Sequence, residues 1–256
     1  MAPEWPAWLA ASNDGSPDSE RWRGVLLHRV RVEHADPAAA ILDYARARHI
    51  DLIVIGAHGD RSESLFLCQV VEQAFLGRTA EQVVRHAPCP VAKVMMRGGG
   101  YPERVKRLLV PYDGSSLASL ALAYARDLAG RYDARLDLLH VVEDSHRLAD
   151  AAVDEEASRL RVELMDAFET TRGPAITAGF HVAHGHPERA IRAFVREHDV
   201  DLVVQGAHSD EGRDVLGIVA SEVARTVPCS VLTVRETTNG SGASASAAPL
   251  RLAVGL

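Results

Sequence analysis

The sequence predicts an α/β fold with a doubly wound, mainly parallel sheet, and two observations lead to this prediction. Short, nearly continuous apolar runs that end in glycine alternate with segments whose apolar residues recur at helical spacing. One such run is also repeated, since "DLIVIGAHGD" from Asp51 returns as "DLVVQGAHSD" from Asp201. Alternating strands and helices form right-handed parallel units, and the repeat indicates two related domains in tandem.

The repeat extends well beyond these ten residues. "HADPAAAILDYARARHIDLIVIGAHGD" from His34 aligns with "HGHPERAIRAFVREHDVDLVVQGAHSD" from His184 at an offset of 150 residues. "EQVVRHAPCPVAKV" from Glu81 aligns with "SEVARTVPCSVLTV" from Ser221, where the offset is only 140. The loop after the Gly-Ala-His turn is therefore ten residues shorter in the second copy.

Both copies contain the same succession of elements. A helix is expected after Pro37 and after Pro187, because proline suits the first helical position and apolar residues follow at helical spacing. The next element is the β-branched run itself, which suits a parallel strand that is buried on both faces. Helices over 80–86 and 219–226 then lead to a last strand in each copy, 90–95 and 230–234.

The second copy has additional elements in front of this repeat. A buried strand from Arg104 ends in "PYDGSS", and a helix with an apolar face begins at Ser116. A second strand starts at Ala134, and a charged helix follows over about 151–170. With five strands and four helices, residues 101–236 are predicted to form one complete doubly wound domain.

The first copy lacks room for these elements, because only 33 residues precede His34. "NDGSPDSER" resembles "YDGSSLAS" without an apolar strand before it, and "GVLLHRVRVEH" supplies at most one strand. We expect residues 1–98 to be a truncated, degenerate domain that "RGGGYP" joins to the second. The Gly/Ala/Ser-rich residues 237–256 are expected to be a disordered tail.

Composition and charge exclude several classes of protein. A chain of 256 residues with 47% hydrophobic and 25% charged residues is typical of a soluble globular protein. It contains neither a secretory leader nor an apolar run long enough for a membrane helix, so we expect a cytoplasmic protein. The net charge of −7, with scattered basic residues, argues against a nucleic-acid surface. Three cysteines, Cys68, Cys89 and Cys229, lack the spacing of a metal site and favour free thiols, buried at Cys89 and Cys229.

Ligands of doubly wound sheets bind beyond the carboxyl ends of the strands, where the strand order reverses. Two loops of the second copy are expected there: "PYDGSS" and "QGAHSDEGRDVLGIV". Glycines allow backbone N–H groups to approach a phosphate, and a helix N-terminus favours its charge. The Asp113 carboxylate can accept a hydrogen bond from an amine or a ribose hydroxyl.

Five motifs in order, "LLVPYDGSS", "LDLLHVVED", "HGHPERAI", "DLVVQGAHS" and "VPCSVLTV", resemble those of the universal stress protein A family. The resemblance covers 104–235 fully and 32–94 in part. It implies a Rossmann-like fold and, in one branch of the family, binding of an adenine nucleotide (ATP, ADP or AMP). The positions that it assigns to the base, the ribose and their loop in the second copy are Pro111, Asp113, Ser115, Val141, Gln205 and Gly206.

The phosphate loop departs from the family pattern of Gly, two residues, Gly, nine residues, then Gly followed by Ser or Thr. In the second copy Ser209 replaces the second glycine, the gap to Gly217 is seven residues, and Ile218, before Val219, replaces the hydroxyl residue. The corresponding positions of the first copy are Gly56, Gly59, Gly77 and Thr79, with seventeen residues intervening that include a predicted helix over 67–75. Arg78 is a further phosphate candidate, although a solvated surface arginine is the simpler interpretation. These departures predict a weakened phosphate site in the second copy. The first copy, which has no proper base-binding strand, is not expected to hold ATP by itself.

Enzymatic interpretations find little support in the sequence. "HGH" at 184–186 has no fourth metal ligand at usable spacing. It also lacks the His or Thr that a nucleotidyl transferase motif would have at Ala183. His58 and His208 have no nucleophile or orienting carboxylate nearby in the sequence. We expect no metal site and no enzyme, although weak hydrolysis of ATP stays open.

Two functional hypotheses remain. In the first, the protein is a stress-response module that binds an adenine nucleotide and acts through dimerisation and contact with an unspecified protein partner. In the second, it binds no nucleotide and acts as a dimeric scaffold. The resemblance implies that last strands pair across a two-fold axis, so 90–95 and 230–234 are expected to pair within the chain, as a pseudo-dimer, or between chains, as a homodimer.

Overall fold

The computed structural model describes the chain in eight stretches, which form two compact units, 1–36 and 37–256. The stretches are 19–22, 25–28, 36–57, 76–95, 105–143, 150–207, 216–235 and 252–255. The boundary between the units falls inside the predicted first domain, because the rest of that domain shares one sheet with the second copy. The domain bounds 1–98 and 101–236 stay a prediction.

The first unit contains a β-hairpin. Strand β1 (Ser19–Trp22) pairs antiparallel with β2 (Val25–His28), so that Trp22 lies opposite Val25. The sequence predicted at most one strand in "GVLLHRVRVEH", which agrees with β2, whereas β1 lies in a stretch for which no strand was predicted. Two residues separate the strands, a spacing at which local antiparallel pairing forms without any longer apolar run.

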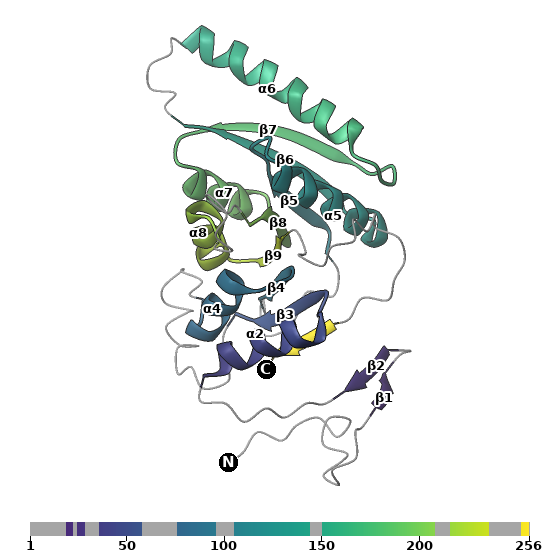
Figure 1. Ribbon diagram of the computed structural model, residues 1–256. Helices are drawn as coiled ribbons and strands as arrows, with labels where there is room; N and C mark the ends of the chain where they lie inside the picture. Colours follow the sequence, from purple (N-terminus) through teal and green to yellow (C-terminus); the bar gives the residue numbers. More distant parts are fainter. Residues whose placement is uncertain are drawn as a thin grey trace. The chain divides into compact units, whose positions relative to one another are not determined.

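Within the described residues, the second unit is built on an eight-stranded sheet in the order β10-β3-β4-β9-β8-β5-β6-β7 (Figure 1). Its strands are β3 (Leu52–Gly56), β4 (Val91–Val94), β5 (Arg107–Pro111), β6 (Arg135–Val142), β7 (Ala178–His184), β8 (Leu202–Gly206), β9 (Ser230–Val234) and β10 (Leu252–Gly255). Neighbouring strands run parallel except at the pair β4–β9. The predicted α/β class with a mainly parallel sheet is confirmed.

The helices lie close to their predicted positions. They are α2 (Pro37–Arg48), α4 (Arg78–His86), α5 (Ser116–Tyr132), α6 (Asp150–Thr170), α7 (Pro187–Glu197) and α8 (Ile218–Thr226). Pro187 occupies the first position of α7, as its fixed φ and missing N–H favour. In its described residues, the second copy therefore has the five strands and four helices that its sequence predicts.

The helices cover the sheet in two layers (Figure 1). On one face α2, α4, α7 and α8 bury a core that runs through both copies and includes Ile53, Val91, Val203 and Val231. On the other face α5 and α6 pack over the strands of the second copy, with Leu136 at 0% exposure. Both faces of the parallel strands are thus apolar, as the continuous β-branched runs predict.

The two copies join through their last strands. β4 pairs antiparallel with β9, with Ala92 opposite Leu232. The sequence left open whether this pairing would occur within one chain or between two, and the structure forms it within the chain. The sheet consequently continues from one copy into the other.

Strand β10 corrects the expectation of a fully disordered tail. Residues Leu252–Gly255 pair parallel with β3, with Leu252 opposite Leu52. An unpaired strand edge exposes N–H and C=O groups that a further strand can satisfy. The Gly/Ala/Ser-rich composition before β10 gave no indication of this tertiary contact. Residues 237–251 and 256 lie outside the described stretches. None of the described helices has the length and hydropathy that crossing a membrane would require.

Candidate ligand site

The order of the strands reverses at β5. This strand pairs with β6 on one side and with β8 on the other, and all three run parallel. The chain proceeds from β5 to β6 and β7 in one direction, while β8 and β9 lie in the other. A reversal of this kind opens a crevice at the carboxyl ends of the strands, so the loop after β5 lies beside the end of β8.

The backbone of the loop after β5 is held at Tyr112 by three contacts. Its N–H donates to the carbonyl oxygen of Leu139 at 2.9 Å, and its own carbonyl oxygen accepts from Nδ1 of His140 at 2.8 Å. Its hydroxyl lies 3.2 Å from Oγ of Ser119. The contact of His140 was not predicted from the sequence, although the position of His140 next to Val141 on β6 was a usable signal.

Asp113 and Ser115 form the turn into α5. Oδ1 of Asp113 accepts from the N–H of Ser115 at 2.9 Å, and Oγ of Ser115 accepts from the N–H of Ala118 at 3.1 Å, which caps the helix. Gly114 between them has φ of +83°, a conformation that side chains disfavour. The exposed carboxylate of Asp113 is therefore held at the positive end of the helix dipole.

Strand β6 extends past the end of β5. Pro111, the last residue of β5, lies opposite Leu139, and β6 continues to Val142. Val141 is half-buried and pairs with Ala183 of β7 on its other side. The structure thus brings Pro111, Asp113 and Val141 to the same edge of the sheet.

The side chain of Gln205 is committed to the interior of the protein. It is 3% exposed, and Nε2 donates to the carbonyl oxygen of Ala220 in α8 at 2.8 Å and to Oγ1 of Thr233 at 3.3 Å. Only the backbone at Gln205 is left for a ribose. The sequence assigned Gln205 to the ribose without specifying its atoms, and the buried side chain leaves the main chain for that predicted role.

Gly206 is required by packing as well as by any ligand. A Cβ atom at this position would lie 2.8 Å from the backbone carbon of Leu117 in α5, closer than real Cβ contacts. The absence of a side chain lets β8 approach the first turn of α5. This packing role of Gly206 was not predicted from the sequence, because it depends on the approach of α5 to β8.

The N-terminus of α8 carries the remaining predicted phosphate positions of the second copy. Gly217 is the N-cap residue, with φ of −61° and no side-chain cap. Ile218 is 87% exposed and Val219 is partly exposed. The first two residues of α8 therefore offer backbone N–H groups and apolar side chains to this edge of the sheet.

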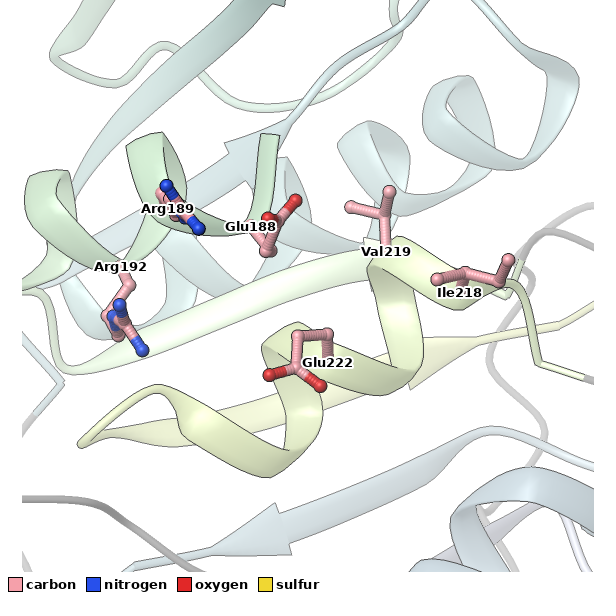
Figure 2. Close-up of a pocket in the computed structure, with 6 residues that line it drawn as sticks. All are labelled: Glu188, Arg189, Arg192, Ile218, Val219 and Glu222. Carbon is pink, nitrogen blue, oxygen red and sulfur yellow. The ribbon is translucent and has the colours of Figure 1, made fainter. Parts of the chain in front are cut away.

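An open cavity of about 450 Å³ lies between the first turns of α7 and α8 (Figure 2). It is lined by Glu188, Arg189, Arg192, Ile218, Val219 and Glu222. Glu222 is paired with Arg225 of its own helix at 2.7 Å. Two guanidinium and two carboxylate groups balance in this lining, so its net charge does not favour an anion.

The first copy places its predicted residues at the equivalent edge. Gly56 ends β3, and Gly77 precedes α4 and donates from its N–H to the carbonyl oxygen of Ala57 at 2.9 Å. Thr79 lies in the first turn of α4 and is half-buried. Gly59, Ser209, Cys68 and the predicted helix over 67–75 lie outside the described residues, so these predictions stay untested.

In the described stretches, His181 packs against a buried carboxylate, and Cys89 and Cys229 are buried in the core. No group of three or more potential metal ligands gathers in those stretches. His181 contacts Oδ1 of Asp137 through Nε2 at 3.0 Å. Cys89 and Cys229 are buried free thiols, which confirms the prediction for both. Burial raises the pKa of Cys89 to about 11, which keeps that thiol protonated at neutral pH.

Comparison with known proteins identifies the family. The sequence model of the universal stress protein family matches residues 13–94 and 104–235, which together cover most of the chain. The chain belongs to the universal stress protein family. The first match begins at residue 13, whereas the sequence motifs indicated a resemblance in the first copy only from residue 32.

Individual universal stress proteins are similar over different shares of the chain. One from Staphylococcus haemolyticus is 29% identical over 139 residues, which cover 51% of this chain and 84% of the relative. The crystal structure of one from Archaeoglobus fulgidus is 25% identical, covers 78% of this chain and 65% of its own, and has a TM-score of 0.51. A Pseudomonas aeruginosa protein described as functionally unknown has the same fold, with 19% identity, a TM-score of 0.57 and coverage of 78% and 68%.

Proposed function

We propose that the second copy of this universal stress protein binds an adenine nucleotide in the crevice between β5 and β8. One observation carries the proposal: the Asp113 carboxylate is held at the N-terminus of α5 by its hydrogen bond to Ser115, beside the reversal of strand order. A fixed acceptor at such a position suits an exocyclic amine or a ribose hydroxyl. The three contacts of Tyr112 reduce the entropy lost when a ligand orders the loop.

The proposed ligand is AMP or ADP in preference to ATP. Val141 would contact the base through its backbone, and the backbone at Gln205 and Gly206 would contact the ribose. Ile218 presents an apolar side chain where the family pattern has a hydroxyl, and an apolar group cannot bond a terminal phosphate. Nucleotide occupancy would then alter the contacts of this cytoplasmic protein with another protein.

Two measurements test the nucleotide. Freshly purified protein is denatured and the supernatant is chromatographed for adenine nucleotides, and the melting temperature is measured with AMP, ADP and ATP. A ligand at 100 times its Kd stabilises a protein by roughly 2.7 kcal/mol, which is a measurable shift. Asp113→Ala is expected to abolish the shift, whereas Asp127→Ala, at an exposed position on α5 that is paired with Arg131 at 2.7 Å, is expected to keep it.

The competing function is a nucleotide-free scaffold, and the apolar first turn of α8 favours it. In that case no nucleotide is released on denaturation, and none of the three nucleotides raises the melting temperature. This result would remove the nucleotide-binding proposal and leave the paired copies, joined through β4 and β9, as the part that contacts another protein.

A further inference from the structure

Strand β10 stands in the first copy where β5 stands in the second. The sheet order β10-β3-β4 mirrors β5-β8-β9, because β3 repeats β8 and β4 repeats β9. Both β10 and β5 run parallel to their neighbour. The position beside β3 that corresponds to β5 is thus filled by residues 252–255.

The register of the two pairs is also the same. Leu252 lies opposite Leu52 in the first copy, and Leu108 lies opposite Leu202 in the second. Residues 52 and 202 are equivalent at the repeat offset of 150. Leu252 therefore occupies the site of Leu108, residue for residue.

The sequences of the two strands agree with this register. "RLAVGL" from Arg251 aligns with "RLLVPY" from Arg107 without a gap, so that arginine, leucine and valine recur at the same positions. The alignment that the sequences prefer is the one that the sheet independently imposes. A one-residue slip would have exchanged the two faces of the strand.

From these observations we infer that residues 252–255 act as the first strand of the first copy, supplied from its C-terminal side, and that the outer edge of β3 is a docking site for this segment. The two copies would then share one plan, in which the first is completed in permuted order. Docking would consist of main-chain hydrogen bonds along β3, the mode known as strand addition.

The connection between β9 and β10 is long enough for docking within one chain. Three strand spacings of about 4.8 Å, roughly 14 Å in all, separate the two strands in the sheet. They run antiparallel, so the end of β9 and the start of β10 lie at the same edge of the sheet. Seventeen residues, 235–251, separate the two strands in the sequence, and a chain of that length can reach up to roughly 56 Å, well beyond the gap. A linker that spans this gap without strain gives β10 an effective concentration of about millimolar.

The edge of β3 also needs an occupant. Its sequence, "LIVIG", is apolar and β-branched, without the proline or charge that protects many edge strands. An open edge of this kind pairs with another chain, and two chains can exchange their β10 segments. Docking of β10 within the chain would suppress both outcomes.

Amide hydrogen exchange of the full-length chain tests this inference. The variant Ala253→Pro/Val254→Pro removes two consecutive N–H groups, one of which must face β3. We expect amides of residues 52–56 to exchange at least about 10-fold faster in this variant, while residues 202–206 of β8 keep their rate. The matched control Ser244→Pro/Ala245→Pro, in the linker, is expected to leave both rates unchanged. A synthetic peptide of residues 248–256, added to the β10 variant, is expected to restore protection of β3.

Three results would overturn the inference: equal exchange of residues 52–56 in wild type and β10 variant, an equal effect of the linker control, or failure of the peptide to protect β3. If the β10 variant unfolds, so that β8 also exchanges fast, the wild-type chain decides. Residues 252–255 must then be protected relative to 237–250, and equal exchange of the two stretches refutes docking. Light scattering, expected to give a monomer mass for the wild type at low concentration, separates docking within a chain from exchange between chains.

Discussion

Lys93 of the first copy donates a hydrogen bond from Nζ to the carbonyl oxygen of Ala224 in the second copy, at 3.0 Å. The reverse contact also exists, because Nη2 of Arg235 in the second copy donates to the carbonyl oxygens of Val84 and Arg85 in the first. These carbonyls lie in the last turns of α8 and α4, where the helix dipole favours a cation. Each copy therefore caps a helix of the other across the junction of β4 and β9.

Lys93 is expected to make the stability of the protein rise with pH. Burial, opposed in part by the nearby Cys229, lowers the pKa of Lys93 from 10.5 to about 8. Between these two values the folded state loses the proton while the unfolded state keeps it, so the free energy of unfolding increases with pH by up to roughly 3 kcal/mol. We expect the stability difference between wild type and Lys93→Met to change by about 2 kcal/mol in favour of wild type from pH 7 to about pH 10.

Urea denaturation of both proteins at the two pH values measures this change. Ionisation of Cys89 affects wild type and variant alike and cancels in the difference. Lys106→Met, at an exposed lysine, is the matched control and is expected to show a much smaller change. A difference between wild type and Lys93→Met that is independent of pH would contradict the prediction.

Asp137→Asn is expected to destabilise the protein by about 3 kcal/mol at neutral pH, since it breaks a buried ionic cluster. Asp137 is fully buried and accepts from Nε of Arg107 at 2.6 Å, Nε of Arg135 at 3.0 Å and Nε2 of His181 at 3.0 Å. Burial acts to raise the pKa of Asp137, but the hydrogen bonds from His181, Arg107 and Arg135 together hold the pKa below its usual value of 3.8.

This carboxylate therefore contributes stability that is fully present above pH 3.8 and is lost as the pH falls through the lower folded pKa. Chemical denaturation from neutral to acid pH is expected to show the gap between wild type and Asp137→Asn closing below about pH 4. The exposed Asp127→Asn serves as control, with a loss below about 0.5 kcal/mol. A constant gap down to acid pH would refute the role given to the charge.

Gly206→Ala is expected to cost about 1 to 3 kcal/mol of stability, because its Cβ would collide with the backbone of Leu117. The matched control is Gly77→Ala, where the nearest atom would be 3.4 Å away and the loss is expected to be smaller. Thermal unfolding without nucleotide compares the two variants. Equal losses would show that close packing at Gly206 is not the constraint.

Ile218→Ser tests the phosphate side of the proposed function. The side chain is exposed, so the change is expected to leave stability nearly unaltered, and it supplies the hydroxyl that the family pattern has at this position. We expect the affinity for ATP relative to AMP, measured by calorimetry, to rise at least about 3-fold, since a hydrogen bond to a charged group contributes more than about 1 kcal/mol. Val162→Ser, exposed on α6, is the control, and an unchanged ratio in Ile218→Ser would argue against a phosphate at this turn.

The elements of the second copy followed from local sequence. The spacing of apolar residues predicted the helices after Ser115 and Pro187, and the β-branched runs predicted strands such as β8. These signals depend on residues that lie a few positions apart, so they can be recognised without knowledge of the tertiary structure. The position of Asp113 also followed from the sequence, because this residue lies in the loop after a predicted strand and the strand order places that loop at the crevice. Its role towards a base stays a prediction.

The sequence by itself determined the repeat, the α/β class and the edge of the sheet at which a ligand would lie. Tertiary structure alone decided that β4 meets β9 within the chain, that Gln205 turns inward to α8, and that residues 252–255 join β3. Open strand edges and register select strand partners that lie more than 100 residues apart in the sequence. The orientation of a buried amide side chain is set by the hydrogen-bond acceptors that surround it. The local pattern of residues contains no signal for these tertiary contacts. For this reason a stretch with the composition of a linker could end in a strand.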